Sequence, residues 1–261
     1  MRERVDYQSQ LEQVREELQP RIDGNLLACR TVLLRLQVIH QQVIEQSDID
    51  LNASTRWVAL WELSGRCLAL GSALVEQVRT GFGPESVGTM RVIHEACNLL
   101  HAIADDDSGD LTRRWLAGET IMQRALADHL DELEGEAIAI IDALGMQLDV
   151  DLVAGNREIY HRLSQPAHNA RPGFADSIAR PLRLFAYGPH PDIRANTVYV
   201  EMTGVLVESC LIAAGHALTA IIGGSFYTDA VIPLIEERQT IEKTMPVDAN
   251  VRAHYGWHGA P

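Results

Sequence analysis

An all-α fold, an antiparallel bundle of long helices, is what this 261-residue sequence predicts. Ala, Leu, Glu, Arg and Gln dominate, and these residues lose little side-chain entropy in a helix. Aromatic residues make up only 5% of the chain, and runs of β-branched residues bounded by turns are scarce, which argues against a sheet of three or more strands. Apolar residues recur at spacings of three or four, the period of a helix with one buried face.

The helices follow one another between short polar or glycine-proline breaks. In the first, Leu11, Val14 and Leu18 begin an apolar stripe that continues to Leu36. The breaks are "TGFGPES" before the third helix, "DDDSGD" before the fourth and Gly145 after it, and Pro166 ends the fifth. We expect helices at residues 8–46, 55–79, 86–105, 111–144, about 149–166, 194–222 and 228–243.

Residues 169–193 are rich in proline, glycine and arginine and predict one elaborated loop in the bundle. The whole chain then divides into a long N-terminal helix at 1–50 that packs on the bundle, the bundle itself at 51–245, and a tail at 246–261.

The charge of −14 makes the chain repel nucleic-acid backbones and anionic membranes at long range, which argues against a general nucleic-acid coat protein. The segment 157–194 is an exception. It carries six arginines against three acidic residues, a net +3, together with three histidines. A basic, histidine-bearing segment in an acidic chain predicts a local anion site.

We expect a cytoplasmic protein without metal or cofactor. The four cysteines lie in apolar helical patterns without CxxC or metal-ligand spacing, which is typical of reduced, buried thiols. A di-iron bundle needs two Glu-x-x-His pairs, and only Glu158–His161 has that spacing. No signal-peptide core is present near the N-terminus, and the most apolar segment, 205–224, contains Glu208 and His216, which favours a bundle helix over a membrane span.

The stretch "RVIHEACNLLH" at 91–101 places Arg91 and Glu95 on the same face of the third helix, four residues apart. One interpretation is a partly buried ion pair that sets the register of the helix. The other places both side chains at the rim of a pocket.

The stretch "IYHRLSQPAHNARPG" at 159–173 is the strongest candidate for chemistry. An arginine can hold a phosphate with paired hydrogen bonds, and a histidine titrates near neutrality and can move a proton. Arg162 and His168 could together cleave RNA through its own 2′-hydroxyl without a metal. The alternative is that these side chains cap helix ends and bond within the core. The expected supporting residues are Tyr160, His161 and Ser164, and the expected anion-binding residues are Arg157 and Arg171.

Together, "MRVIHEACNLLHAI" and "IYHRLSQPAHNARPG" resemble an uncharacterised bacterial family with Arg-x-x-x-Glu on one helix and Tyr-x-x-Leu-Ser-x-x-x-His on a later one. That family is similar to the HEPN superfamily of α-helical bundles, and the resemblance covers roughly residues 55–225. It implies a HEPN-like bundle in which Arg162 and His168 form the Arg-x4–6-His motif of a metal-independent ribonuclease.

The resemblance further implies a homodimer, RNA as substrate, and a toxin or phage-defence role with a cognate antitoxin or defence partner. Active members usually carry a polar residue directly after the arginine, where this chain has Leu163, and Pro166 interrupts the motif. A non-catalytic binding or regulatory bundle with a structural or small-anion-binding Arg/His cluster is therefore the alternative function.

Overall fold

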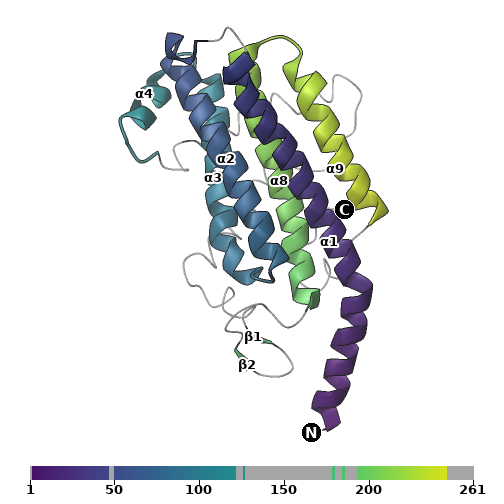
Figure 1. Ribbon diagram of the computed structural model, residues 1–261. Helices are drawn as coiled ribbons and strands as arrows, with labels where there is room; N and C mark the ends of the chain where they lie inside the picture. Colours follow the sequence, from purple (N-terminus) through teal and green to yellow (C-terminus); the bar gives the residue numbers. More distant parts are fainter. Residues whose placement is uncertain are drawn as a thin grey trace, which may run out of the picture.

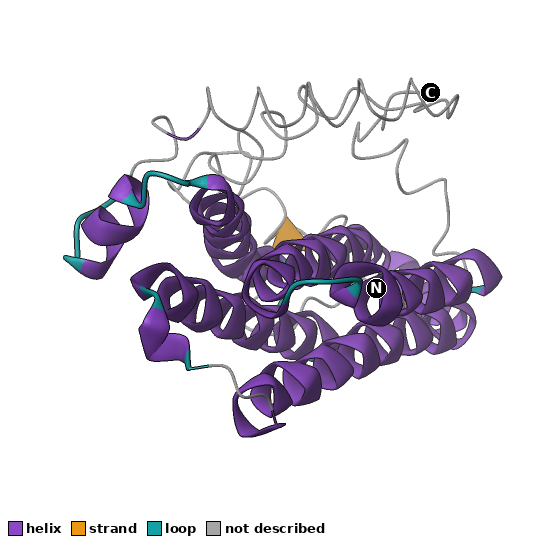
Figure 2. Cartoon of the chain, turned by 90° about the horizontal axis from the view of Figure 1, so that it is seen from above, coloured by secondary structure: helices purple, strands orange, loops and turns teal. Residues whose placement is uncertain are grey.

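A computed structural model confirms the all-α fold, and its described part is almost wholly helical (Figure 2). It describes residues 2–46, 50–121, 126, 178–179, 184–185 and 193–245. The α-helices in these ranges are α1 (Arg2–Gln46), α2 (Thr55–Arg79), α3 (Val87–Asp105), α4 (Asp110–Leu116), α8 (Ile193–Ile222) and α9 (Ile232–Thr244). Shorter elements are the 3-10 turns η1 (Leu51–Ala53) and η2 (Pro84–Ser86), the π-helical turn η3 (Tyr227–Val231), and the antiparallel strands β1 (Ile178–Ala179) and β2 (Leu184–Phe185).

Helices α1 and α2 run antiparallel, as the short connection between them predicts. Near the end of α1, the His40 ring hydrogen-bonds the Trp61 carbonyl at 2.9 Å. Earlier in α1, Arg30 pairs with Glu76, which lies near the end of α2. Helix α9 also runs antiparallel to α1, with which it lies side by side (Figure 1).

Helices α3 and α8 run in the same direction. The Cys97 thiol of α3 lies close enough to the Cys210 thiol of α8 for the pKa of Cys97 to be raised. Four residues further along α3, the His101 ring lies 5.5 Å from the ring of His216, which is six residues further along α8. The long segment between the two helices allows a parallel arrangement, which a short loop would not.

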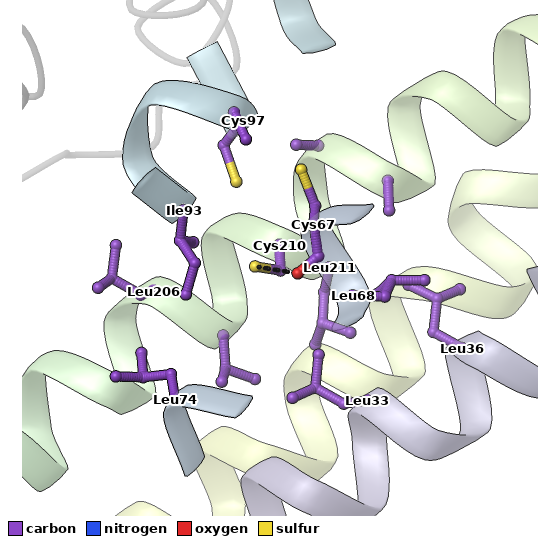
Figure 3. Close-up of a cluster of buried hydrophobic side chains, with 14 of the residues drawn as sticks. Leu33, Leu36, Cys67, Leu68, Leu74, Ile93, Cys97, Leu206, Cys210 and Leu211 are labelled. Carbon is purple, nitrogen blue, oxygen red and sulfur yellow. Dashed lines mark hydrogen bonds between the residues drawn. The ribbon is translucent and has the colours of Figure 1, made fainter. Parts of the chain in front are cut away.

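The core lies where α1, α2, α3 and α8 meet (Figure 3). Its apolar side chains come from all four helices, for example Leu33, Leu68, Ile93 and Leu211, and each is buried. Gly71 permits the close approach of α1 and α8 to α2, because a Cβ there would lie only 3.3 Å from two carbons of Leu33 and 3.5 Å from the Cys210 sulfur.

All four cysteines are free thiols and are buried, which confirms the prediction. Cys67, Cys97 and Cys210 come from three different helices and meet in the core (Figure 3), where the Cys210 thiol donates to the Cys67 carbonyl at 3.4 Å. Hydrogen bonding to Cys97 and burial raise the pKa of Cys67 well above its usual value. These thiols therefore stay protonated and serve to pack the core.

The prediction of a continuous helix over residues 111–144 is wrong in its first part, because helix α4 ends at Leu116. Gly118 adopts φ 78°, the left-handed conformation that glycine accepts without a steric penalty, and its N–H bonds the Trp115 carbonyl at 2.9 Å. Residues 117–121 are not helical, and Leu126 is helical and packs against Ala102 of α3. Three predicted segments lie outside the described residues: the helix at 149–166, most of the loop at 169–193, and the tail at 246–261.

Helix α1 begins earlier than expected and passes through Pro20 without interruption. Its N-terminal part projects beyond the ends of α2, α3 and α8 (Figure 1). By length and composition, α2 and residues Thr197–Ile222 of α8 could each cross a membrane, but about half of each apolar window is buried within the bundle. Core helices of soluble proteins pass the same test, so this observation is weak evidence for a membrane span.

Candidate functional site

Most of the predicted site lies outside the described residues. This holds for Arg162 and His168 and for the neighbours expected to support them or to bind an anion, namely Arg157, Tyr160, His161, Ser164 and Arg171. The predicted site residues that the structure describes are Arg91 and Glu95, both on α3.

Helix α3 has one apolar face and one polar face. The apolar face, including Met90, Ile93 and Leu100, is fully buried in the core. The polar face consists of residues three or four positions apart, which places them in one row along the helix. We call this row the α3 polar face, and its members are Arg91, His94, Glu95, Asn98, His101 and Asp105.

Arg91 and Glu95 form the predicted ion pair. The Arg91 Nε donates to Glu95 Oε1 at 2.8 Å, and the two side chains are 20% and 32% exposed. The interpretation as a partly buried pair within one helix is confirmed. Because the carboxylate offsets the guanidinium charge, the pair by itself provides no net positive charge for an anion.

His94 lies next to this pair and is buried. Its Nε2 lies 3.3 Å from the Asn98 amide nitrogen. Burial lowers the pKa of His94 to about 4, although the neighbouring Glu95 carboxylate acts in the opposite direction. His94 is therefore neutral at physiological pH and can accept or donate a hydrogen bond without carrying a charge.

At the far end of the α3 polar face, α8 contributes His216. The rings of His101 and His216 lie 5.5 Å apart with a tilt of 33°, and His216 Nε2 lies 3.7 Å from Asp105 Oδ1. Burial, reinforced by His216, lowers the pKa of His101 to about 4. The buried His216 Nδ1 has no hydrogen-bond partner among the described residues.

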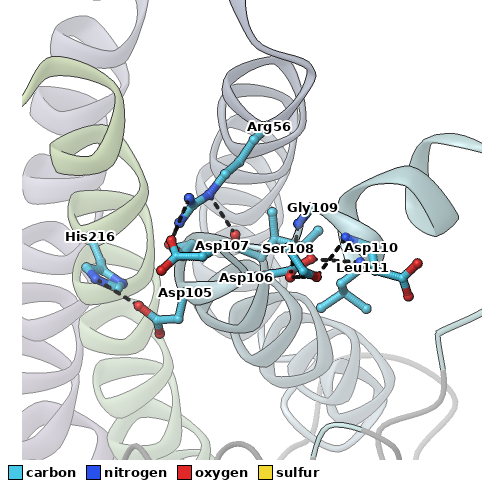
Figure 4. Close-up of polar contacts among 11 residues, drawn as sticks. Arg56, Asp105, Asp106, Asp107, Ser108, Gly109, Asp110, Leu111 and His216 are labelled. Atoms are coloured by element: carbon cyan, nitrogen blue, oxygen red, sulfur yellow. Dashed lines mark hydrogen bonds and ion pairs between the residues drawn. The ribbon is translucent and has the colours of Figure 1, made fainter.

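Beside this cluster, the turn after α3 is held by Arg56 and Asp106 (Figure 4). Arg56 of α2 donates to the carbonyls of Ile103, at 3.1 Å, and Ala104, so it satisfies acceptors at the C-terminus of α3 and offsets the negative end of its dipole. The Asp106 carboxylate accepts from the Leu111 N–H at 2.7 Å. Burial raises the pKa of Asp106, but hydrogen bonds from Ser108 and from backbone N–H groups outweigh it, so the pKa is lowered.

The sequence by itself does not indicate the His101–His216–Asp105 cluster or the role of Arg56. His94 and His101 are seven residues apart and predictably share a side of α3, but nothing local indicates that His216 faces them. Among the described residues, no three His, Cys, Asp or Glu side chains are placed to hold a metal ion.

The lowered pKa values of His94 and His101 predict that stability falls in mild acid. Both pKa values lie below the ordinary histidine value of 6.5, so between pH 6.5 and pH 4 the unfolded chain binds more protons than the folded chain. The stabilising contribution of these histidines is therefore complete above about pH 6.5 and decreases as the pH falls toward 4. At pH 5, we expect each histidine to cost on the order of 2 kcal/mol.

Urea denaturation at pH 7 and pH 5 measures this effect. The His94→Gln variant, whose side chain keeps hydrogen-bonding groups but does not titrate, should lose less stability between the two pH values than the wild type. Equal losses in both proteins would contradict the depressed pKa of His94.

Comparison with known proteins adds no family assignment, since no protein-family model, no curated protein and no solved structure matches the chain.

Proposed function

We propose that this protein is a HEPN-like, metal-independent endoribonuclease in which Arg162 and His168 carry out the reaction. The observation that carries the proposal is the Arg162-x5-His168 spacing inside a basic segment of an otherwise acidic chain. Two further observations support it. The chain is an all-α bundle, as the resemblance implies, and the Arg-x-x-x-Glu residues of the accompanying motif, Arg91 and Glu95, are bonded to one another on one helix face.

The proposed reaction needs only groups on the protein and the RNA. The 2′-hydroxyl attacks the adjacent phosphorus as His168 accepts its proton, and the bond to the 5′-oxygen breaks as that oxygen takes the proton back from His168. Arg162 stabilises the extra negative charge of the pentacoordinate phosphate. The products are a 2′,3′-cyclic phosphate and a 5′-hydroxyl.

The remaining predicted residues take supporting roles in this proposal. Arg157 and Arg171 hold neighbouring phosphates through the local positive charge. Tyr160, His161 and Ser164 fix the conformation of the motif. The Arg91–Glu95 pair, which is neutral overall, orients the motif rather than binding phosphate.

The second candidate is a non-catalytic binding or regulatory bundle, and one observation favours it. The described part of the α3 polar face pairs within itself, Arg91 with Glu95 and His94 with Asn98. Such pairing is what a structural cluster requires. In either case, we propose a cytoplasmic homodimer, and for the nuclease a toxin or phage-defence role with a cognate antitoxin or defence partner.

The two candidates differ in a direct cleavage assay. Purified protein, incubated with end-labelled RNA and EDTA, should produce fragments with 2′,3′-cyclic phosphate ends. A matched substrate with a single 2′-deoxynucleotide at the cleaved position should stay intact, because it lacks the nucleophile. Absence of RNA cleavage, or cleavage that EDTA abolishes, would reject the proposed nuclease in favour of the binding bundle.

A further inference from the structure

Helix α1 presents an apolar stripe to solvent, on the side opposite its core-facing residues. Leu27, Leu34 and Val38 are 63%, 47% and 55% exposed, more than any other large apolar side chain among the described residues. They are spaced by seven and four residues, so they lie in one row. The core-facing side of the same helix, including Leu33 and Leu36, is fully buried.

The stripe contains little that favours contact with water. Thr31 lies between Leu27 and Leu34, and its hydroxyl donates to the Leu27 carbonyl at 2.8 Å, so its polar group is already bonded within the helix. An exposed apolar row with charged residues along its edges is a candidate surface for contact with another protein.

The charged side chains at the two edges of the stripe form ion pairs with neighbouring helices. On one edge, Arg30 lies 3.7 Å from Glu76 of α2, which also pairs with Arg79 at 2.8 Å. On the other edge, Arg35 pairs with Glu237 of α9. The surface is therefore an apolar centre between paired charged side chains, which matches the apolar core and polar rim of a protein interface.

We propose that the α1 stripe, defined as Leu27, Thr31, Leu34 and Val38, is where a second copy of this chain docks. Two copies that each carry a charge of −14 repel one another over most of their surfaces, so they can meet stably only where the surface is uncharged or neutralised. The stripe is such a surface.

The stripe is also complementary to itself in an antiparallel arrangement. With a two-fold axis between Thr31 and Leu34, Leu27 of one copy lies opposite Val38 of the other, and Leu34 lies opposite Thr31. In this isologous contact, every apolar side chain of the stripe is covered.

The available area suits a stable dimer. The part of α1 from Leu18 to Gln46 is about 42 Å long at about 1.5 Å per residue. With a margin on the adjacent α2 and α9, whose axes lie about 8–10 Å away, the face is roughly 20 Å wide, which gives about 800 Å² per partner. That area is typical of a specific interface.

Light scattering after size exclusion tests the proposal. The wild type should show twice the chain mass of 28.9 kDa at micromolar concentration. Leu34→Glu and Val38→Glu should each shift the protein to the monomer mass, while the helical circular dichroism of the wild type and cooperative thermal unfolding are retained. The matched control is Ile212→Glu, which places the same charge at an exposed apolar position of α8 and should leave the dimer intact.

Cross-linking then tests the antiparallel arrangement. The native cysteines are 0–4% exposed, so a cysteine introduced on the stripe reacts selectively. Mixed Leu27→Cys and Val38→Cys proteins should cross-link to each other more strongly than either does to itself. Three results would overturn the proposal. The first is a wild type that is monomeric at all concentrations, the second is a dimer that only Ile212→Glu dissociates, and the third is stronger cross-linking of Leu27→Cys to itself than to Val38→Cys. None of these readouts depends on ribonuclease activity.

Discussion

The His168→Ala variant is expected to cleave RNA roughly 10²–10⁴-fold more slowly than the wild type, the usual contribution of a general acid or base. In the proposed mechanism, His168 removes the 2′-hydroxyl proton, and alanine offers no group to accept it. Initial rates on end-labelled RNA in EDTA measure the effect. The matched control is His190→Ala, which removes another histidine from the same basic segment and should retain the wild-type rate.

Arg162→Ala should reduce the rate on the order of 10²-fold or more, because an oriented cation no longer stabilises the charged transition state. Ser164→Ala should cost far less if the serine only supports the end of its helix. Melting temperatures within a few degrees of the wild type would show that these losses arise in catalysis. If His168→Ala unfolds the protein, or cleaves at the full rate, His168 is structural and the binding bundle is the better account.

Arg238→Ala is expected to be among the most destabilising changes in the described part of the chain. The arginine is only 5% exposed, where α9 meets α1 and α8. Its Nε donates to Glu208 at 2.7 Å and its Nη2 to Glu242 at 2.7 Å. Gly204 makes room for the guanidinium, because a Cβ there would lie 2.5 Å from Nη1.

Removal of Arg238 leaves two carboxylates close together without their cation, in a site partly withdrawn from water. Loss of one partner of a buried ion pair costs about 3–5 kcal/mol, and we expect roughly 2–4 kcal/mol here because both glutamates retain some contact with solvent. The pKa of Cys29, which burial raises to about 11, should rise further without the nearby guanidinium.

Urea denaturation of Arg238→Ala against Arg35→Ala measures this cost. Arg35 also pairs with a glutamate of α9, but its side chain is 54% exposed, and an exposed pair contributes about 0–1 kcal/mol. Similar losses for the two variants would mean that burial of Arg238 adds nothing to the stability of the contact between α9 and the bundle.

The positions of α2, α3, α8 and α9 could be predicted closely from the sequence, because the helical period and the glycine-proline breaks act over a few residues. The Arg91–Glu95 pair was predictable for the same reason, since four residues within one helix determine its geometry. Even locally the prediction failed at Gly118, where a glycine within an otherwise helical pattern ends α4. A glycine is tolerated inside some helices and ends others, and the local pattern does not distinguish them.

The sequence by itself therefore determined an all-α chain, the bounds of most described helices and the residues that share a face of each. Only the tertiary structure decided which faces meet. It placed His216 beside His101, buried Arg238 between Glu208 and Glu242, made α3 and α8 parallel, and left Leu27, Leu34 and Val38 in solvent. The physical reason is that periodicity records whether a side chain is apolar, whereas its partner depends on how helices distant in the sequence pack around a common core.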